Sequence, residues 1–287
     1  MAARNTTRRS AAQGASFRNA AVRLSEIGRE FYGRGWALGT SGNYSALLSR
    51  NPLRMAITAS GIDKSRLDPD DFLEVNGRGQ AGNGSRAALN PPAANPCAAN
   101  HSAEFRGAAS AETLLHMAVA RTRGAGAVLH THSVWGTLLS TECAAQGGIA
   151  IEGYEMLKGL AGVRTHEHRE WLPILQNQQD RASVAKAVAQ ALQRHPRTHG
   201  FLLEGHGLYT WGRDIEEARQ HVEILEFLLE VVGRRLPAGS VDSVPSVPSV
   251  DSVPSVDSVP SVVSVLSVLS VGNSGRKKVM RRVRKSR

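Results

Sequence analysis

The sequence predicts a domain of the α/β or α+β class, in which helices cover a β-sheet. Its 287 residues are 41% hydrophobic and 21% charged, which is ordinary for a globular protein and allows a sizeable core. Short apolar runs that fit buried strands alternate with longer segments whose apolar residues recur at helical spacing. A chain that alternates these two patterns packs its helices against a sheet.

The predicted elements follow one another from Ser16 to residue 235. The first is a helix with a possible cap at Ser16 and a glycine stop at Gly33 and Gly35. Its apolar face consists of Ala20, Leu24, Ile27 and Phe31. Further helices are predicted at 112–123, 134–141, 180–194 and 214–235, and short strands at 44–48, 55–58, 127–130, 171–175, 200–203 and 208–211.

Three segments depart from this pattern. Residues 1–15 are predicted as a disordered leader, although their Arg-, Ser- and Ala-rich composition also fits an organelle transit peptide. Residues 80–109, rich in Ala, Asn, Gly and Pro, are predicted as a long loop that interrupts the domain of residues 16–239. The dipeptide Ser-Val recurs every three residues, eleven times in all, from Ser240 to Val271, so residues 240–287 are predicted as a low-complexity extension that specifies no packed core.

The formal net charge of +10 lies at the two ends of the chain. Five arginines and no acidic residue precede Glu26, and the last twelve residues contain eight Lys or Arg and no acidic residue. The predicted domain is therefore close to neutral, and the charge does not indicate a nucleic-acid-binding core. A solvated basic tail is the simpler interpretation, with a weak contact to RNA or anionic lipid as the alternative.

The cysteines and the hydropathy favour a cytoplasmic protein. Cys97 and Cys143 are the only cysteines and lie far apart, so neither a disulfide framework nor a four-cysteine zinc site is expected. No apolar run approaches the ~20 residues of a membrane span, and no apolar segment of a secretory signal follows the basic start of the chain.

Two histidines at the end of a predicted strand are the strongest chemical signal. His130 and His132 follow the apolar residues 127–129 and are two positions apart, so their rings lie on one face of the strand. Paired imidazoles suit zinc or another divalent cation of borderline softness. Two surface histidines beside a helix cap would give the same pattern, so a third ligand is needed.

The candidate third ligand is His206, which lies between Gly205 and Gly207 directly after the apolar residues 201–203. The flanking glycines allow the backbone to approach a ligand closely. Three imidazoles that leave one coordination position open are typical of catalytic zinc.

Two glycine-containing turns are candidates for holding an anion. Residues 39–43 (Gly-Thr-Ser-Gly-Asn) follow the first helix, and residues 58–64 (Thr-Ala-Ser-Gly-Ile-Asp-Lys) follow a predicted strand. Free backbone N–H groups and small hydroxyls in such turns suit a phosphate. Neither turn matches a nucleotide-binding fingerprint, and ordinary turns would look similar.

Taken in order, these motifs resemble the class II aldolase and adducin family over about residues 17–236. The motifs that carry the likeness are 39–43, 58–61, 110–112, 130–132 and 205–207. Within the family the likeness is greatest to a dehydratase branch that acts on a phosphorylated sugar, through residues 110–116, 123–133 and 154–159. The resemblance implies a three-layer αβα fold with a central, mainly antiparallel sheet, and a homotetramer with active sites between subunits.

The resemblance also implies roles for individual residues. His130, His132 and His206 become the ligands of one Zn²⁺ per subunit, and Glu155 becomes the general acid/base. Glu155 could instead form a salt bridge with Lys158, three residues later.

The remaining implied contacts concern the substrate. Glu112 is expected to contact the substrate or the metal, and Asn43, Ser60, Gly61 and Ser110 match phosphate-binding positions. The long loop 80–109 and the Ser-Val extension have no counterpart in the family, so their roles stay open.

The resemblance, through residues 154–159, implies a dehydration. A sugar with a ketone at C2 and hydroxyls at C3 and C4 loses water when a base removes the C3 proton and the C4 hydroxyl leaves, and a cation beside the ketone stabilises the enediolate. An aldolase that splits a sugar phosphate is the first alternative, because it would share the metal and phosphate sites. A non-catalytic, adducin-like interaction module with a basic tail is the second, and the three histidines argue against it.

Overall fold

The structure is a computed structural model that describes residues 2–81 and 108–235, with side chains from residue 16 onward. The chain divides into two units, Met1–Pro237 and Ala238–Arg287, and every described residue belongs to the first. The predictions for most of the 80–109 loop, for the Ser-Val extension and for the basic tail lie outside the described residues.

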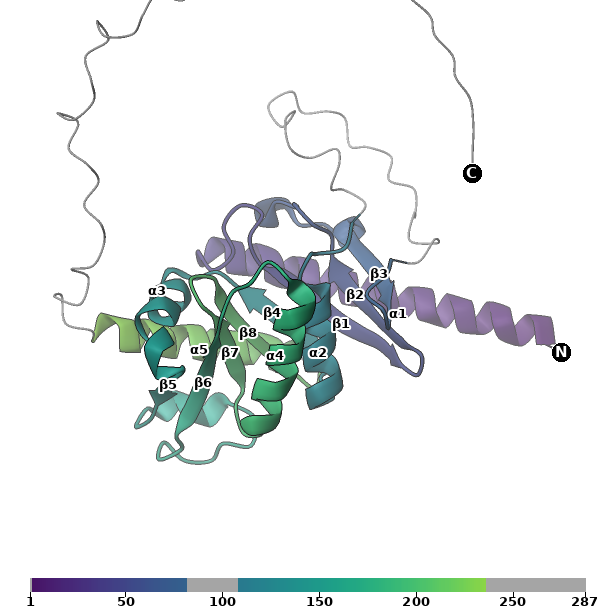
Figure 1. The fold of residues 1–287 in the computed structure, drawn as a ribbon. Coiled ribbons are helices and arrows are strands. Elements are labelled where there is room, and N and C mark those ends of the chain that lie inside the picture. Colours follow the sequence, from purple (N-terminus) through teal and green to yellow (C-terminus); the bar gives the residue numbers. More distant parts are fainter. Residues whose placement is uncertain (1, 82–107, 236–287) are drawn as a thin grey trace, which may run out of the picture. The chain divides into compact units, whose positions relative to one another are not determined.

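One mostly antiparallel sheet of eight strands forms the centre of this unit (Figure 1). The spatial order is β3-β2-β1-β4-β8-β7-β6-β5, and only β6 and β7 run parallel. The strands are β1 (Asn43–Arg50), β2 (Leu53–Thr58), β3 (Phe72–Asn76), β4 (Ala127–Thr131), β5 (Gly148–Ile151), β6 (Glu170–Leu175), β7 (Gly200–Leu203) and β8 (Gly207–Gly212).

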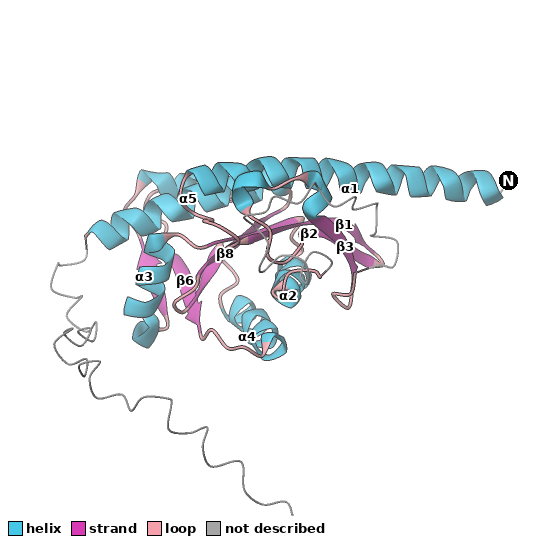
Figure 2. Cartoon of the chain, turned by 90° about the horizontal axis from the view of Figure 1, so that it is seen from above, coloured by secondary structure: helices cyan, strands magenta, loops and turns pink. Residues whose placement is uncertain are grey.

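Helices cover both faces of the sheet. The helices are α1 (Ala2–Gly33), α2 (Thr113–Arg123), α3 (Val134–Glu142), α4 (Arg181–Arg194) and α5 (Ile215–Arg234). Helices α1 and α5 lie on one face, and α2 and α4 lie on the other (Figure 2). The predicted three-layer fold with a mainly antiparallel central sheet is therefore confirmed.

Two clusters of buried apolar residues show why the helices dock in this way. On one face, Leu24, Ile27 and Phe31 of α1 pack with Leu129 of β4. On the other face, Val188 of α4 belongs to a cluster that also includes residues of α2, β4, β7 and β8. Both helices bury one apolar stripe, as their periodicity predicts.

The start of the first helix was predicted incorrectly. Helix α1 begins at Ala2 and continues through Ser16, so Ser16 is not its N-cap and residues 2–15, predicted as a disordered leader, are helical. The alanines and arginines of this segment have high intrinsic helix propensity, which favours continuation of the helix toward the N-terminus.

The sequence patterns also missed two strands, β3 and β5. They are the outermost strands of the sheet and contain only five and four residues. Edge strands of this length carry little periodic signal of their own and depend on pairing with β2 and β6. No helix in the described part of the chain is both long enough and apolar enough to span a membrane.

Candidate metal and active site

Three histidines converge where β4, β7 and β8 meet. His130 lies near the end of β4, His132 follows that strand, and His206 lies in the turn between β7 and β8. The Nε2 atom of His130 is 2.8 Å from Nε2 of His132 and 3.4 Å from Nε2 of His206. The structure thus brings together the three histidines that the sequence singled out.

The local backbone explains this convergence. Strands β4 and β8 are antiparallel neighbours in which His130 pairs with Tyr209, so the turn before β8 lies beside the end of β4. Gly205 adopts a left-handed conformation with φ of 60°. Gly207 is so close to β4 that a Cβ atom there would overlap the carbonyl oxygen of Thr131. Both glycines are therefore needed to place His206 against His130.

The protonation of the cluster suits a metal. Burial lowers the pKa of His130 well below its ordinary value and, with the neighbouring His206, lowers the pKa of His132 to about 4. Burial also lowers the pKa of His206. The Nδ1 atom of His130 lies 2.9 Å from the carbonyl oxygen of Leu208 and donates to it, which leaves the Nε2 lone pair free. All three rings are neutral imidazoles near neutral pH, the form that binds a cation.

The donor set fits a divalent cation. Nitrogens face nitrogens at the centre of the cluster, so the three rings cannot satisfy one another fully by hydrogen bonds. Nδ1 of His206 is buried and has no hydrogen-bond partner among the described residues. His130, His132 and His206 could therefore hold a metal ion of the kind that imidazoles prefer.

Glu112 supplies a carboxylate beside these rings. It lies at the N-terminus of α2, with Oε2 3.4 Å from Nε2 of His130 and Oε1 3.4 Å from Nε2 of His206. Burial would raise the pKa of Glu112, but the two histidines and a hydrogen bond from the Asn43 amide outweigh burial and lower the pKa to about 2. Glu112 is therefore a carboxylate that lies close enough to the histidines to contact a metal bound there.

A chain of hydrogen bonds behind Glu112 was not predicted from the sequence. The Asn43 amide donates to Glu112 at 2.7 Å, and Nε2 of His116 bonds the carbonyl end of the same amide. The hydroxyl of Ser45 lies 2.8 Å from Nδ1 of His116. His116 is four residues after Glu112, so both face the same side of α2, and that spacing is the signal that could have identified it.

Asn43, which was expected to contact a phosphate, is engaged with Glu112 and His116 in this structure. Both ends of its amide already bond Glu112 and His116, so in this structure it orients the carboxylate. Tyr209 supports the site in a similar way, because its ring stacks on the ring of His130 with centroids 3.8 Å apart.

The two predicted phosphate turns lie together. The N–H of Ser60 donates to the carbonyl of Ala108, and the N–H of Ser110 donates to the carbonyl of Thr58, so Ser60, Gly61 and Ser110 lie on neighbouring segments. The buried Lys64 joins the other turn to them, since its Nζ donates to the carbonyl oxygens of Thr40 and Ile62 at 3.2 and 2.9 Å.

Lys64 also places a positive charge near the histidines. Burial lowers the pKa of its amine to about 8, so the amine is still mostly protonated at neutral pH. That charge is one of the influences that lower the pKa of His132. The burial of Lys64 depends on contacts between the two turns, so a role for this residue could not be predicted from the turn's sequence alone.

Glu155 lies on the surface of the chain. It begins a short 3-10 helix, η5 (Glu155–Gly159), and its side chain is 69% exposed. The carboxylate pairs with Lys158 at 2.5 Å and with Nδ1 of His166 at 3.1 Å, and these neighbours lower its pKa. Among the described residues, no hydrogen bond or ion pair joins Glu155 to the histidine cluster.

Comparisons with known proteins agree with the fold. The model of the class II aldolase and adducin N-terminal domain matches residues 22–232. The methylthioribulose-1-phosphate dehydratase of Sorangium cellulosum is 40% identical over 217 residues, which cover 75% of this chain and 92% of that protein. The enzyme of the same name from Methylococcus capsulatus is 39% identical over 219 residues, covering 76% and 95%.

A solved structure shows the same fold. L-fuculose-1-phosphate aldolase of Thermus thermophilus superposes with a TM-score of 0.52 at 24% identity, over 77% of this chain and 94% of that one. At this identity the similarity establishes the architecture alone.

Proposed function

Because the chain belongs to the class II aldolase and adducin family, we propose that it is a lyase that dehydrates 5-methylthioribulose 1-phosphate to 5-methylthio-2,3-diketopentyl 1-phosphate, with zinc as cofactor. The observation that carries the proposal is the similarity to methylthioribulose-1-phosphate dehydratases at about 40% identity over more than nine-tenths of their length. The proposed place of the reaction is methionine salvage in the cytoplasm.

The reaction removes one water molecule and needs no other reactant. A base takes the proton from C3, the C3–C4 double bond forms, and the C4 hydroxyl leaves with a proton as water. The resulting enol at C3 tautomerises to the ketone, which gives the 2,3-diketone.

The histidine cluster would hold the metal, and the neighbouring groups would orient the substrate. A bound zinc ion supplies a Lewis acid that stabilises negative charge developing on the substrate's oxygens. Glu112, which bonds Asn43 and through it His116, is proposed to contact the metal or a substrate hydroxyl, and its distance from the histidines supports this role. The turns that carry Ser60, Gly61 and Ser110, with the charge of Lys64 behind them, are proposed to bind the phosphate.

Glu155 is proposed as the acid/base, acting in a homotetramer with sites between subunits. Its exposure supports this arrangement, because a carboxylate on the surface of one chain can complete the site of another. The adjacent Met156 is 40% exposed, and Val134, two residues after His132, is 70% exposed. Large exposed apolar side chains at both places are suitable for burial between subunits.

The test is a product assay on purified protein with methylthioribulose 1-phosphate. A diketone product supports the dehydratase, whereas an aldehyde product would show the retro-aldol cleavage of an aldolase. The metal is tested in the same assay with His132→Ala, which should lose about one zinc per chain and turnover together, because two imidazoles hold zinc poorly. His195→Ala, a change at a partly exposed histidine outside the site, should keep both. Full zinc and full turnover in His132→Ala would contradict the ligand assignment.

A further inference from the structure

The segment that carries Glu155 connects β5 to β6 and contains no strand. Residues 152–169 form this connection, and Leu157 and Leu160 bury their side chains in the core. The N–H of Gly153 donates to the carbonyl of His166, so the two ends of the connection lie together. A connection of this length needs fixed points if Glu155 is to hold one position.

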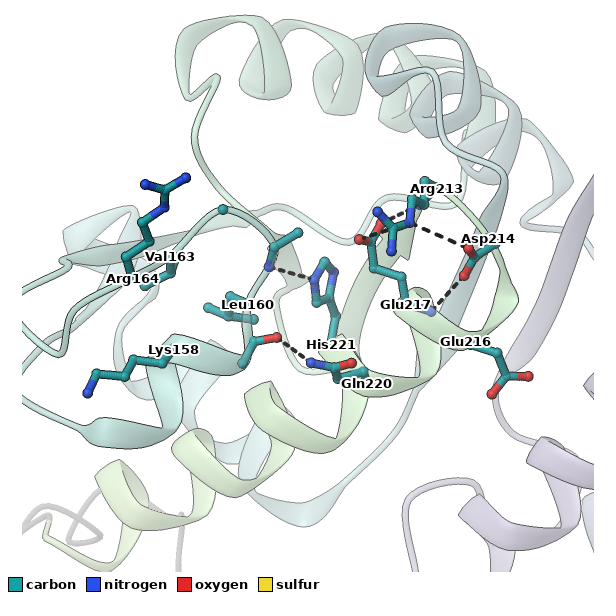
Figure 3. A pocket seen from close by; sticks show the side chains of 13 residues that line it. Lys158, Leu160, Val163, Arg164, Arg213, Asp214, Glu216, Glu217, Gln220 and His221 are labelled. Carbon is teal, nitrogen blue, oxygen red and sulfur yellow. Dashed lines mark hydrogen bonds and ion pairs between the residues drawn. The ribbon is translucent and has the colours of Figure 1, made fainter.

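Ala161 is such a fixed point, because side chains hold its peptide groups from two directions. Nε2 of His199 donates to the Ala161 carbonyl at 2.8 Å, and the Ala161 N–H donates to Nε2 of His221 at 3.0 Å. On the same side of α5 as His221, the Gln220 amide donates to the Gly159 carbonyl at 2.7 Å (Figure 3). Ala161, Gln220 and His221 are among the residues that line a pocket of about 460 Å³ beside the connection.

A buried carboxylate organises these contacts. Glu170 begins β6, and its side chain is fully buried. It accepts hydrogen bonds from Nδ1 of His199 at 2.8 Å, from the His199 backbone N–H at 2.7 Å and from Nε2 of His168 at 2.8 Å. His168 lies near the end of the connection. Glu170 therefore holds the connection directly at His168 and indirectly, through His199, at Ala161.

His168, Glu170 and His199 have the composition of a metal site, but their chemistry differs from that of the first cluster. At His130 and His132, nitrogens face one another, whereas here one ring nitrogen of each histidine faces an oxygen of Glu170. His199 donates from both ring nitrogens, to Glu170 and to Ala161, so it is an imidazolium whose charge offsets the buried carboxylate. Burial opposes this charge and Arg123 adds to the opposition, but Glu170 outweighs both and raises the pKa of His199.

We propose that Glu170, His199 and His221 form a clamp that positions the Glu155 segment for catalysis. The three residues are positioning residues: His199 and His221 contact the backbone of the segment, Glu170 acts through His199 and the side chain of His168, and none of the three touches the reacting groups. The proposal rests on the proposed function in assigning the proton transfer to Glu155. The clamp itself is independent of that assignment.

The experiment combines hydrogen exchange with a double-mutant cycle on the full chain. Glu170→Gln keeps the shape of the side chain and removes the charge that keeps His199 protonated, and His199→Gln can bond only one of its two partners at a time. Each variant should accelerate amide exchange at Ala161 by ~10-fold or more and leave exchange in β4 unchanged. Each should lower kcat by ~10-fold with KM within ~3-fold and zinc content unchanged.

The cycle separates positioning from general damage. In a Glu155→Gln background the same two changes should lower kcat by less than ~2-fold, because the group they position is already lost. Glu167→Gln, an exposed carboxylate in the same connection, is the matched control and should change neither exchange nor kcat.

Several results would overturn the clamp. Unchanged exchange at Ala161 in both variants would do so, as would an equal loss of kcat with and without Glu155. A second metal ion per chain that is lost in Glu170→Gln would show that these residues form a metal site instead. Full kcat in Glu155→Gln alone would refute the acid/base assignment of the proposed function and the catalytic purpose of the clamp, while exchange at Ala161 would still report whether the segment is held.

Discussion

Glu155 lies on the surface of the chain, and the proposed mechanism gives it the task of moving protons. If it is the acid/base, Glu155→Gln should keep zinc and substrate binding and lower kcat by ~10²–10⁴-fold, which is the usual contribution of a positioned proton-transfer group. If the carboxylate only pairs with Lys158 and His166, the change should leave both the melting temperature and turnover nearly unchanged, because exposed ion pairs contribute little to stability. Zinc content, melting temperature and kcat of the one variant separate the two roles.

A second carboxyl group, Glu226, has the opposite environment. It lies on α5, is 2% exposed, and accepts a hydrogen bond from the hydroxyl of Thr131, between His130 and His132. Burial raises its pKa to about 7, despite hydrogen bonds from Ser133 and Thr131 that act in the other direction. The folded chain therefore favours the protonated acid.

The raised pKa of Glu226 makes stability depend on pH. The stabilisation from protonated Glu226 is complete below the unfolded pKa of about 4.5 and is lost as pH rises through 7. The side chain in Glu226→Gln cannot ionise, so the variant does not lose stability in this way as pH rises. The free energy of unfolding of the variant minus that of wild type should therefore increase by up to about 3 kcal/mol from pH 4.5 to pH 8. Urea unfolding at both pH values measures this difference. Comparison with wild type at each pH removes the effects of pH that both proteins share. The control Glu230→Gln, an exposed change on the same helix, should show no such gain.

At the scale of elements, the metal cluster depends on how closely β8 approaches β4. A Cβ atom at position 207 would overlap the Thr131 carbonyl and lie 3.2 Å from Cα of His132. Gly207→Ala must therefore separate the strands where they carry the histidines, and we expect a loss of stability of about 1–3 kcal/mol together with ~10-fold weaker zinc binding.

Chelator competition and thermal unfolding measure the two effects of Gly207→Ala. Gly33→Ala at the end of α1 is the matched control, since a Cβ atom there has no described atom within 4 Å. Zinc affinity equal to that of wild type in Gly207→Ala would mean that the close approach of the strands does not set the ligand geometry.

Individual helices and strands were easier to predict from the sequence than the contacts between distant residues. Strand β4 was predictable because its apolar residues run directly into His130 and His132, and α5 because its apolar face repeats over five turns. The link from His116 through Asn43 to Glu112 could not be predicted, because it joins residues about 70 positions apart through a buried hydrogen-bond network. The edge strands β3 and β5 were missed because their pairing, and not their own pattern, defines them.

At the scale of the whole molecule, the site residues belong to the first of the two units. Asn43, the earliest of them, and His206, the last, both lie within Met1–Pro237. The buried face of α5 completes this unit, with Leu225, Leu228 and Leu229 in one of its apolar clusters. Four copies of this unit, with Val134 and Met156 covered at their contacts, would form the proposed tetramer.

A chain that lacks residues 240–287 should therefore keep about one zinc per subunit, the mass of four chains in sedimentation and kcat within ~2-fold of wild type. The reason is that the Ser-Val repeat specifies no packed core and contributes none of the proposed ligands or contacts. A longer deletion that also removes α5 is the contrasting control and should not fold, because it removes the apolar residues that cover one face of the sheet. Loss of zinc or of the tetramer on deletion of 240–287 would show that the extension has a structural role. If the deletion abolishes only binding to RNA or anionic vesicles, the eight basic residues at the end have a role separate from catalysis.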